Sequence, residues 1–496
     1  MKLNEAITLL EGARVIGESG VDIAEIAYHT ERVVPGSCFV AIRGTASDGH
    51  AFVEEAIRRG AHMVVTERPV VELPFGVTNV VVRDTRDALA RLSAAHFINP
   101  SLAMKLVGVT GTSGKTTITY LLEEIFRAAG WSPGVIGTVE YRYAGARHAA
   151  SHTTPESYEL QKLLRAMVDR GVTSCAMEVS SHALDMERVV ACHFDGAIFT
   201  NLTPEHLDYH STMEAYYTSK ARLFLERLVA SVKEKTFAVV NTDDAYGRRL
   251  AACVTVPLVS YGLTSGALVT STMFTCDAQG LAMMVRTPRG EVKIRSELVG
   301  RFNALNILAA VAAGMALDIE LETIAQAVAR VTRIPGRVDR VPNDKGVLAF
   351  VDYAHKPDAL VNMLSCAKEL AKGRLIVVFG CGGDRDRAKR PLMGEAVARF
   401  ADIAVVTSDN PRTEDPQSII EMILPGLEKG GMCRGANAHG AYYEVIADRR
   451  AAITRAAELS RAGDVLVVAG KGHEDYQIVG KERRHFDDRE VLKEVL

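Results

Sequence analysis

The stretch KLVGVTGTSGKTTITYLLEEIF, from Lys105 to Phe126, decides the fold of the middle of this chain. It reads as a short apolar strand, a glycine-broken turn, and an amphipathic helix with Lys and two Thr at its start. In such a turn, backbone N–H groups and the helix N-terminus point at an anion, and the lysine neutralises it. The pattern predicts a phosphate-binding loop, which consists of Gly111, Thr112, Ser113, Gly114, Lys115, Thr116 and Thr117.

The spacing of this loop departs from the common pattern, because Val109 stands where a glycine usually precedes the second glycine, Gly114. An incidental glycine-rich turn is the alternative. The strand before the loop and the helix after it favour nucleotide binding, and the Thr116 hydroxyl could bind Mg²⁺.

Composition excludes several classes of protein. The chain has 496 residues, 48% of them hydrophobic and 24% charged, and a formal net charge of -3. Without a basic field or an apolar run of membrane-spanning length, neither nucleic acid nor a membrane is an expected partner. The eight cysteines are scattered singly, with no C-x-x-C pair. We therefore expect a protein of the reduced cytoplasm.

Apolar strand-like runs alternate with helical patterns nearly throughout, which predicts an α/β fold with mainly parallel sheets. Three blocks separate, and we place domains at residues 1–100, 101–335 and 336–496. Runs such as SCAMEVSS, GAIFTNLT and ADIAVVTSDNPR end in polar residues, as expected where the carboxyl ends of strands meet a ligand.

Charged and hydroxyl residues follow the strands of the second block. Glu178 ends a buried run and could bind Mg²⁺; His206 and Asp208 follow the next run; Lys220 is expected at the start of a helix. A lone histidine is more often a packing residue, and a lone lysine a solvated charge. Together these residues predict a second charged cluster that faces the γ-phosphate of a nucleotide.

Ten segments in series resemble the Mur ligases and cover essentially the whole chain; they are GVTGTSGKTT, MEVSSHAL, TNLTPEHLDYH, SKARLF, GRFNALNILAA, PGRVDRV, VDYAHKPDAL, FGCGGDRDRAKRPLMG, SDNPRTEDP and AGKGHEDYQ. The resemblance implies three α/β domains. A central phosphate-loop ATPase domain with a parallel sheet would lie between an N-terminal uridine-nucleotide domain and a C-terminal Rossmann-like domain that binds an amino acid. It also implies a monomer.

The resemblance implies an ATP-dependent ligase of peptidoglycan precursor synthesis. ATP would phosphorylate the D-glutamate side chain of UDP-N-acetylmuramoyl-L-alanyl-D-glutamate, and an amine would attack the resulting acyl phosphate. The implied catalytic residues are Lys115, Glu178, His206 and Lys220, with Mg²⁺ held by Thr116, Glu178 and His206. Lys220 matches a lysine that CO₂ converts to a carbamate; an unmodified, salt-bridging lysine is the alternative.

Further ATP contacts are implied for Asn303, Arg337, Asp352 and His355. Two of them have a structural alternative, because Asn303 could cap a helix and Arg337 could form an ion pair at a domain hinge.

The loop SDNPRT indicates which amine enters. An arginine fork pairs bidentately with a carboxylate, and meso-diaminopimelate carries a distal carboxylate that lysine lacks. The D-N-P-R sequence resembles the diaminopimelate-adding branch of the family. The implied contacts to this amino acid are Arg385, Asp409, Asn410, Pro411, Arg412, Gly470 and Glu474. An unpartnered loop arginine is the alternative for Arg412.

Contacts to the uridine-linked substrate are implied for Thr30, Thr45, Ala46, Ser47, Thr153, Thr154, Ser180, Arg188 and Lys220. The sequence departs from the family at His29, Thr30 and Glu31, where Asp-Ser-Arg is usual, and at Met186, where Gln is frequent. For the hydroxyl residues, capping of strand ends is the alternative.

Three rival functions stay open. A lysine-adding relative would differ in the amine, and a folylpolyglutamate synthetase would need neither the uridine block nor the D-N-P-R loop. A nucleotide-dependent switch or regulatory ATPase would turn over ATP without any amine.

Overall fold

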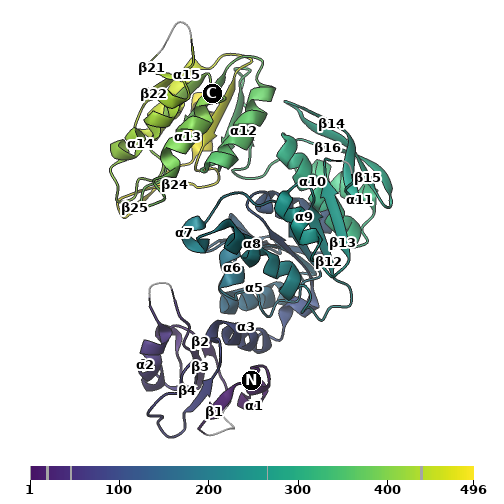
Figure 1. Ribbon diagram of the computed structural model, residues 1–496, viewed down its shortest axis with the longest axis vertical. Helices are drawn as coiled ribbons and strands as arrows, with labels where there is room; N and C mark the ends of the chain where they lie inside the picture. Colours follow the sequence, from purple (N-terminus) through teal and green to yellow (C-terminus); the bar gives the residue numbers. More distant parts are fainter. Residues whose placement is uncertain (1, 18–21, 45–46, 265, 436–439) are drawn as a thin grey trace. The chain divides into compact units, whose positions relative to one another are not determined.

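The computed structural model describes residues 2–17, 22–44, 47–264, 266–435 and 440–496 (Figure 1). The chain divides into two compact units, Met1–Ser260 and Tyr261–Leu496. Both units are α/β, and most of their strands are parallel, as the sequence predicts.

Unit 1 begins with a small sheet in the order β1-β5-β4-β3-β2, in which only β1 is antiparallel to its neighbour. Its strands are β1 (Arg14–Ile16), β2 (Ile26–Ala27), β3 (Ser37–Val40), β4 (Ala61–Thr66) and β5 (Thr78–Val81). The helical segments are α1 (Leu3–Thr8), η1 (Thr30–Arg32), η2 (Gly49–Phe52), α2 (Val53–Arg58), α3 (Thr85–His96) and η3 (Pro100–Ala103).

The other strands of unit 1 follow the order β12-β11-β6-β10-β7-β8-β9 within a larger sheet. These strands are β6 (Lys105–Thr110), β7 (Pro133–Ile136), β8 (Glu140–Tyr143), β9 (Ala146–Ala149), β10 (Ser174–Glu178), β11 (Gly196–Phe199) and β12 (Phe237–Asn241). The helical segments are α4 (Lys115–Ala128), α5 (Ser157–Asp169), α6 (Ser181–Asp185), α7 (Leu207–His210), α8 (Met213–Arg222), η4 (Leu223–Arg227) and α9 (Ala245–Ala251).

The register of this sheet positions the phosphate loop. Strand β6 lies between β10 and β11 and is parallel to both, with Glu178 opposite Val109 and Phe199 opposite Thr110. The carboxyl ends of these three strands therefore meet at one edge of the sheet, where loops bind ligands in α/β proteins.

Unit 2 opens with a β-meander and two helices. Its elements are β13 (Leu258–Gly262), which crosses the division between the units, β14 (Val269–Asp277), β15 (Gly280–Thr287), β16 (Gly290–Ser296), α10 (Arg301–Ala316) and α11 (Leu321–Arg330). Strands β14, β15 and β16 pair antiparallel.

The main sheet of unit 2 follows the order β17-β18-β23-β19-β20-β22-β21. Its strands are β17 (Asp339–Val341), β18 (Leu348–Asp352), β19 (Leu375–Phe379), β20 (Ile403–Val406), β21 (Cys433–Arg434), β22 (Tyr442–Val445) and β23 (Val465–Ala469), and β24 (Tyr476–Val479) and β25 (Glu482–His485) form a separate hairpin. The helices are α12 (Pro357–Leu370), α13 (Lys389–Ala398), α14 (Pro416–Lys429), α15 (Arg449–Leu459) and α16 (Asp488–Val495).

Alternation along the buried strands builds a core on each face of this sheet. On β19, Leu375, Val377 and Phe379 pack with α12, α13 and α14. The intervening Ile376 and Val378 pack with α15 and α16. A strand covered by helices on both faces needs apolar residues at every position, which explains the continuous run LIVVF.

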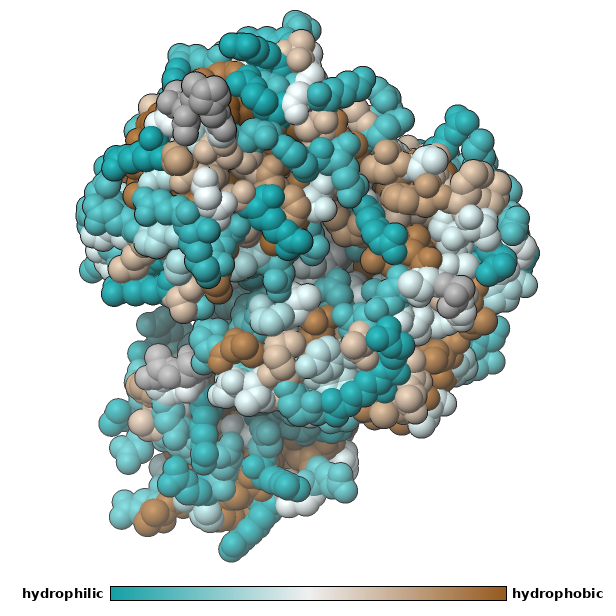
Figure 2. Space-filling model, turned by 45° about the horizontal axis from the view of Figure 1, so that its top comes forward, coloured by the Kyte–Doolittle hydropathy of each residue, from teal (hydrophilic) through white to brown (hydrophobic). Residues whose placement is uncertain are grey.

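The surface and the cysteines agree with the composition. Within the described residues, no helix has the length and apolar character needed to cross a membrane. The face drawn in Figure 2 mixes teal polar side chains with scattered brown apolar ones. All eight cysteines are free, and six of them are buried or partly buried.

Candidate functional site

The predicted phosphate loop joins the end of β6 to the first turn of α4. Gly111 has φ +139°, and a Cβ added there would lie 1.8 Å from Oγ1 of Thr200, so only glycine fits. The N-cap of α4 is Gly114, and in this described stretch no side chain caps the helix. A helix N-terminus without a side-chain cap is suited to an anion.

A loop that follows β11 holds the phosphate loop in place. Ser113 N–H donates to Oδ1 of Asn201 at 3.0 Å, and Thr112 N–H donates to the carbonyl of Asn201 at 2.9 Å. The Thr200 hydroxyl donates to the carbonyl of Ser113 at 2.7 Å. These bonds fix the loop before any nucleotide binds.

Two lysines converge on one carbonyl of this loop. Nζ of Lys115 and Nζ of Lys220 each donate to the carbonyl oxygen of Gly111 at 2.9 Å. Lys220 is 2% exposed, and its ammonium lies 4.6 Å from the centre of the Tyr216 ring. Burial, followed by the charge of Lys115, sets the pKa of Lys220 well below the usual lysine value. Two lysine side chains that share one carbonyl in a buried loop favour an anion beside them.

The predicted position of Lys220 in its helix is wrong. Lys220 lies in the last turn of α8 and not at a helix start, because the helix begins earlier, where Thr212 caps it and accepts from the N–H of Ala215.

Glu178 lies at the edge of the same sheet and is 1% exposed. Its carboxylate accepts from the Thr116 hydroxyl at 2.9 Å, and from both the N–H and the hydroxyl of Thr138, at 3.0 and 2.9 Å. The hydroxyl of Thr116 and the carboxylate of Glu178 are hard oxygen donors beside a phosphate loop, and this donor set fits Mg²⁺.

His206 lies among other aromatic side chains. It is the N-cap of α7 with φ +55°, and its ring centre is 4.8 Å from that of His182. Burial, and then the charges of Lys115 and Lys220, lower the pKa of His206 to about 4. The neutral imidazole has a free lone pair, although imidazole suits Mg²⁺ less well than oxygen does. In the described part of the chain, no three His, Cys, Asp or Glu side chains are arranged as a metal site by themselves. Asp208, which was predicted to belong to the same charged cluster, lies in the first turn of α7.

The residues predicted for the muramoyl-dipeptide also gather near the end of β10. The Thr154 hydroxyl donates to the carbonyl of Glu178 at 2.9 Å, and Thr153 contacts the hydroxyl of Thr138 at 3.0 Å. Ser180 caps α6 by accepting from the N–H of Ala183, so its hydroxyl also has the capping role kept as an alternative.

Arg188 is held by protein groups beside these hydroxyls. It donates to the carbonyl of Thr154 at 3.0 Å, and its Nε lies 3.3 Å from Oε2 of Glu156, an oxygen that Arg86 also contacts at 3.3 Å. Nη2 of Arg188 is 3.4 Å from the sulfur of Met186, so the departure at Met186 replaces a polar neighbour with a weak acceptor.

The uridine residues predicted in the first block are described only in part. Thr30 opens η1 and is half-buried, and Glu31 beside it is exposed. The carbonyl of Ser47 accepts from the N–H of Gly44 at 2.8 Å. The predictions for Thr45 and Ala46 lie outside the described residues.

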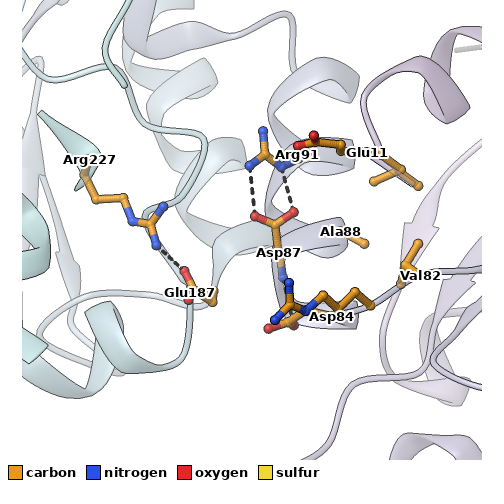
Figure 3. A pocket seen from close by; sticks show the side chains of 10 residues that line it. Glu11, Val82, Asp84, Asp87, Ala88, Arg91, Glu187 and Arg227 are labelled. Atoms are coloured by element: carbon orange, nitrogen blue, oxygen red, sulfur yellow. Dashed lines mark hydrogen bonds and ion pairs between the residues drawn. The ribbon is translucent and has the colours of Figure 1, made fainter. Parts of the chain in front are cut away.

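A cleft of about 510 Å³ lies elsewhere in unit 1, between the residues around α3 and those around η4 (Figure 3). Its lining pairs opposite charges, since Asp87 binds Arg91 and Glu187 binds Arg227. None of the predicted site residues lines it. The cleft is therefore not the candidate site.

In unit 2, the predicted ATP residues are engaged in the fold. Asn303 is buried, and its amide donates to the carbonyl of Val299; the N-cap of α10 is Gly300. Asp352 accepts from the N–H groups of Val338 and Ala354 at 2.7 and 2.8 Å, and its burial raises its pKa. These bonds give Asp352 a structural role as well.

Arg337 and His355 both lie against the ring of Tyr353. The guanidinium carbon of Arg337 is 4.8 Å from the centre of the Tyr353 ring, and the ring of His355 is 4.6 Å from it. Burial, followed by the charge of Lys389, lowers the pKa of His355 to about 4. His355 lies in the loop that follows β18, and Arg337 lies in the segment between α11 and β17.

The residues predicted to bind the amino acid come together at the carboxyl ends of β19, β20 and β23. Nη1 of Arg412 donates to the carbonyl of Gly383 at 2.7 Å. A Cβ added to Gly382 would lie 3.0 Å from Nη1 of Arg412 and 3.9 Å from Cγ of Arg385. The side chains of Arg385 and Arg412 thus both pass close to Gly382, and Arg412 has a backbone partner, unlike the unpartnered arginine of the alternative.

Carboxylates lie on the other side of this loop. The amide of Asn410, which precedes Pro411, donates to Oε2 of Glu474 at 2.9 Å. A Cβ on Gly470 would lie 2.4 Å from Oδ2 of Asp409, so the backbone passes directly against that carboxylate. Burial and the neighbouring charge of Asp409 raise the pKa of Glu474. Cationic and anionic groups therefore face one loop cluster.

Several residues of these sites escaped the sequence reading. The apolar run that contains β11 ends in polar residues, and Asn201 is one of them. That pattern could have identified Asn201 from the sequence. Thr138, Tyr216 and Gln477 carry no such signal, because they reach the sites only through contacts made in the folded chain.

Comparisons with known proteins extend the observations over the whole chain. Family models match at residues 22–97 (Mur ligase family, catalytic domain), 109–314 (Mur ligase middle domain) and 336–472 (Mur ligase, glutamate ligase domain). A Geobacter metallireducens protein named UDP-N-acetylmuramoyl-L-alanyl-D-glutamate--2,6-diaminopimelate ligase is 47% identical, over 99% of this chain and 98% of its own length. Its namesake from Geobacter sulfurreducens is 46% identical, over 99% and 97%. A solved structure of a ligase of the same name is 31% identical and has a TM-score of 0.70, over 95% of this chain and 94% of that one.

Proposed function

Because this chain belongs to the Mur ligase family, we propose that it joins meso-diaminopimelate to the D-glutamate γ-carboxylate of UDP-N-acetylmuramoyl-L-alanyl-D-glutamate, at the expense of ATP. The relatives that match over nearly their full length carry this activity in their names. The proposal makes the chain an enzyme of peptidoglycan precursor synthesis with small-molecule substrates.

The observation that carries the choice of amine is the loop cluster of unit 2. The side chains of Arg385 and Arg412 both pass close to Gly382, and Asp409 and Glu474 lie near each other at the same strand ends. The distal end of diaminopimelate carries a carboxylate and an ammonium, which need a cationic and an anionic partner. Lysine lacks the distal carboxylate, so it would leave the two arginines without an anion.

The reaction has two covalent steps. The γ-carboxylate oxygen attacks the γ-phosphorus of ATP; ADP leaves, and an acyl phosphate forms. The neutral amine then attacks the acyl carbon, phosphate leaves with the C–O electron pair, and the amine loses a proton to give the amide. Activation is needed because a carboxylate is a poor electrophile for an amine.

The first step brings two anions together, so positive charge has to offset their repulsion. Lys115, at the start of α4, is the proposed neutraliser of the β- and γ-phosphates. The first turn of α4 supplies N–H donors to the same groups. Asn303, Arg337, Asp352 and His355 are proposed as further ATP contacts from the family resemblance.

Mg²⁺ would be held by Thr116 and Glu178, and a second ion with the help of His206. When bound, it supplies positive charge to the phosphate oxygens. The hard oxygen donors of Thr116 and Glu178 support this assignment.

We further propose that Lys220 carries a carbamate. Its neutral amine would add to CO₂ and release one proton, which gives an anionic carbamate. The lowered pKa of Lys220 supports the step, because only the unprotonated amine is nucleophilic. The carbamate anion would also lie near the ammonium of Lys115, because both lysines bond to the carbonyl of Gly111.

The uridine-linked substrate is proposed to contact Thr30, Ser47, Thr153, Thr154, Ser180 and Arg188, together with Thr45 and Ala46. The hydroxyls around β10 and the guanidinium of Arg188 suit the anionic dipeptide. We also propose that the domains span residues 1–100, 101–335 and 336–496. The same proposal includes a monomeric state and a cytoplasmic location.

The testing experiment measures ADP release with each substrate omitted in turn, and with diaminopimelate and lysine side by side. We expect release only when ATP, the uridine-linked dipeptide and diaminopimelate are all present. Steady release with ATP alone would indicate an ATPase. Equal rates with lysine would indicate the lysine-adding relative, and a folate substrate in place of the dipeptide would indicate a folylpolyglutamate synthetase.

A further inference from the structure

The β24–β25 hairpin packs against the loop that carries Arg412. The hairpin is a separate two-stranded sheet, labelled beside the main sheet of unit 2 in Figure 1. At its base, the N–H of Phe486 donates to the carbonyl of Asp475 at 2.8 Å, and the buried Nζ of Lys471 donates to the carbonyl of Tyr476. The hairpin is thus fixed to the loop that follows β23.

Its first strand and the turn after it bond to three residues of the Ser408–Thr413 loop, namely Asp409, Asn410 and Arg412. Nε2 of Gln477 donates to the carbonyl of Asp409 at 2.6 Å, and the N–H of Ile478 donates to Oδ1 of Asn410 at 2.9 Å. The N–H of Arg412 donates to the carbonyl of Ile478 at 3.1 Å, and the carbonyl of Arg412 accepts from the N–H of Gly480 at 2.7 Å.

These bonds hold Arg412 in a backbone conformation that it would not adopt by itself. Its φ is +51°, in the left-handed region that side-chain-bearing residues avoid. Such a conformation persists only where its surroundings impose it. The hairpin binds both the N–H and the carbonyl of Arg412, and so it sets the direction in which the guanidinium leaves the loop.

We propose that the β24–β25 hairpin is the specificity element of the amino-acid site, with Gln477 as a positioning residue that acts through Asp409 and Arg412. The inference rests on the proposed function. In this arrangement the guanidinium of Arg412 is preorganised for a carboxylate, and an amino acid with a distal carboxylate gains from that preorganisation. Lysine, which has none, gains nothing from it.

Gln477→Ala removes the side-chain donor, and Gln477→Glu keeps the shape but replaces the amide donor with an acceptor. Arg484→Ala is the matched control, since Arg484 is directly opposite Gln477 in the hairpin and, among the described residues, its side chain bonds only to Glu482 of the same strand, at 2.7 Å. We expect both Gln477 variants to raise KM for diaminopimelate by about fivefold, which is the value of one hydrogen bond. KM for ATP and for the uridine-linked dipeptide should stay within twofold, and the preference for diaminopimelate over lysine should fall.

Hydrogen–deuterium exchange gives a second readout that needs no turnover. The segment 408–414 and the amides of Ile478 and Gly480 should exchange faster in Gln477→Ala than in Arg484→Ala. Unchanged exchange together with unchanged KM would overturn the proposal. Faster exchange without a change in the diaminopimelate preference, or an equal rise in all three KM values, would also overturn it, because the hairpin would then be merely structural. If the unaltered enzyme shows no diaminopimelate-dependent turnover, the proposed function fails, while the exchange data still decide whether Gln477 fixes the loop.

Discussion

Gly111→Ala should disable the phosphate loop through a clash whose size follows from the structure. The new Cβ would lie 1.8 Å from Oγ1 of Thr200, 3.0 Å from Cβ of Thr200 and 3.1 Å from the nitrogen of Asn201. Moving the Thr200 hydroxyl away breaks its bond to the carbonyl of Ser113, at a cost of about 0.5–1.5 kcal/mol. The backbone at φ +139° adds strain of about 1–3 kcal/mol for a residue with a side chain. The expected total is about 2–4 kcal/mol.

The substitution should affect ATP more than it affects folding. The carbonyl of Gly111 holds both Lys115 and Lys220, so a displaced peptide moves the Lys115 ammonium away from the phosphates and shifts Lys220 as well. A misplacement of this kind costs on the order of 10²-fold in rate. We expect kcat/KM for ATP to fall by about that factor, measured by ADP release at saturating concentrations of the other substrates.

Gly145→Ala is the matched control for backbone strain. Gly145 has φ +78° in the turn between β8 and β9, and a Cβ there meets no atom within 4 Å. It should lower the unfolding midpoint slightly, through strain of about 1–2 kcal/mol, and leave kcat/KM for ATP unchanged. If Gly111→Ala kept kcat/KM for ATP within twofold of the unaltered enzyme, or unfolded at the same temperature as Gly145→Ala, the reasoning from the clash would be refuted.

Three further changes probe other parts of the account. Arg412→Ala should raise KM for diaminopimelate at least tenfold and leave KM for ATP unchanged, because a hydrogen bond to a charged group contributes about 1.5–3 kcal/mol. Steady-state kinetics that show no rise in KM for diaminopimelate would contradict the role assigned to Arg412. Lys220→Ala should lower kcat by about 10²- to 10³-fold, and added short carboxylic acids should restore part of it; no rescue in the ADP-release assay would argue against the carbamate. Burial lowers the pKa of both His355 and His473 to about 4, so the folded chain binds fewer protons than the unfolded chain, and these two groups should lower stability by about 3 kcal/mol between pH 6.5 and 5. Urea midpoints that stay constant over this range, or that fall equally in His473→Gln, would contradict that assignment.

The sequence predicts well those features that depend on local pattern. Apolar runs that end in polar residues located β6, β10, β11, β19, β20 and β23, because a buried parallel strand needs continuous apolar residues and its carboxyl end faces a ligand. The glycine spacing likewise predicted the loop between β6 and α4, because the backbone conformation of such a loop requires glycine.

Features that depend on tertiary contacts were not predictable. Thr138 reaches Glu178 across 40 residues of chain, and Gln477 reaches Asp409 across 68. The start of α8 was misjudged because Thr212 is an ordinary capping residue that could have stood in a loop. No single-residue pattern records that Arg412 adopts a left-handed backbone, since the hairpin imposes this conformation from far along the chain.

The central claim is that ATP activates a carboxylate, and an isotope measurement tests it most directly. The uridine-linked dipeptide would carry ¹⁸O in both oxygens of its D-glutamate γ-carboxylate, and the released phosphate would be analysed by mass spectrometry. The account predicts one ¹⁸O in each phosphate, because the carboxylate oxygen that attacks ATP leaves with the phosphoryl group. Unlabelled phosphate formed in step with ADP would mean that water receives the phosphoryl group, and would contradict the account.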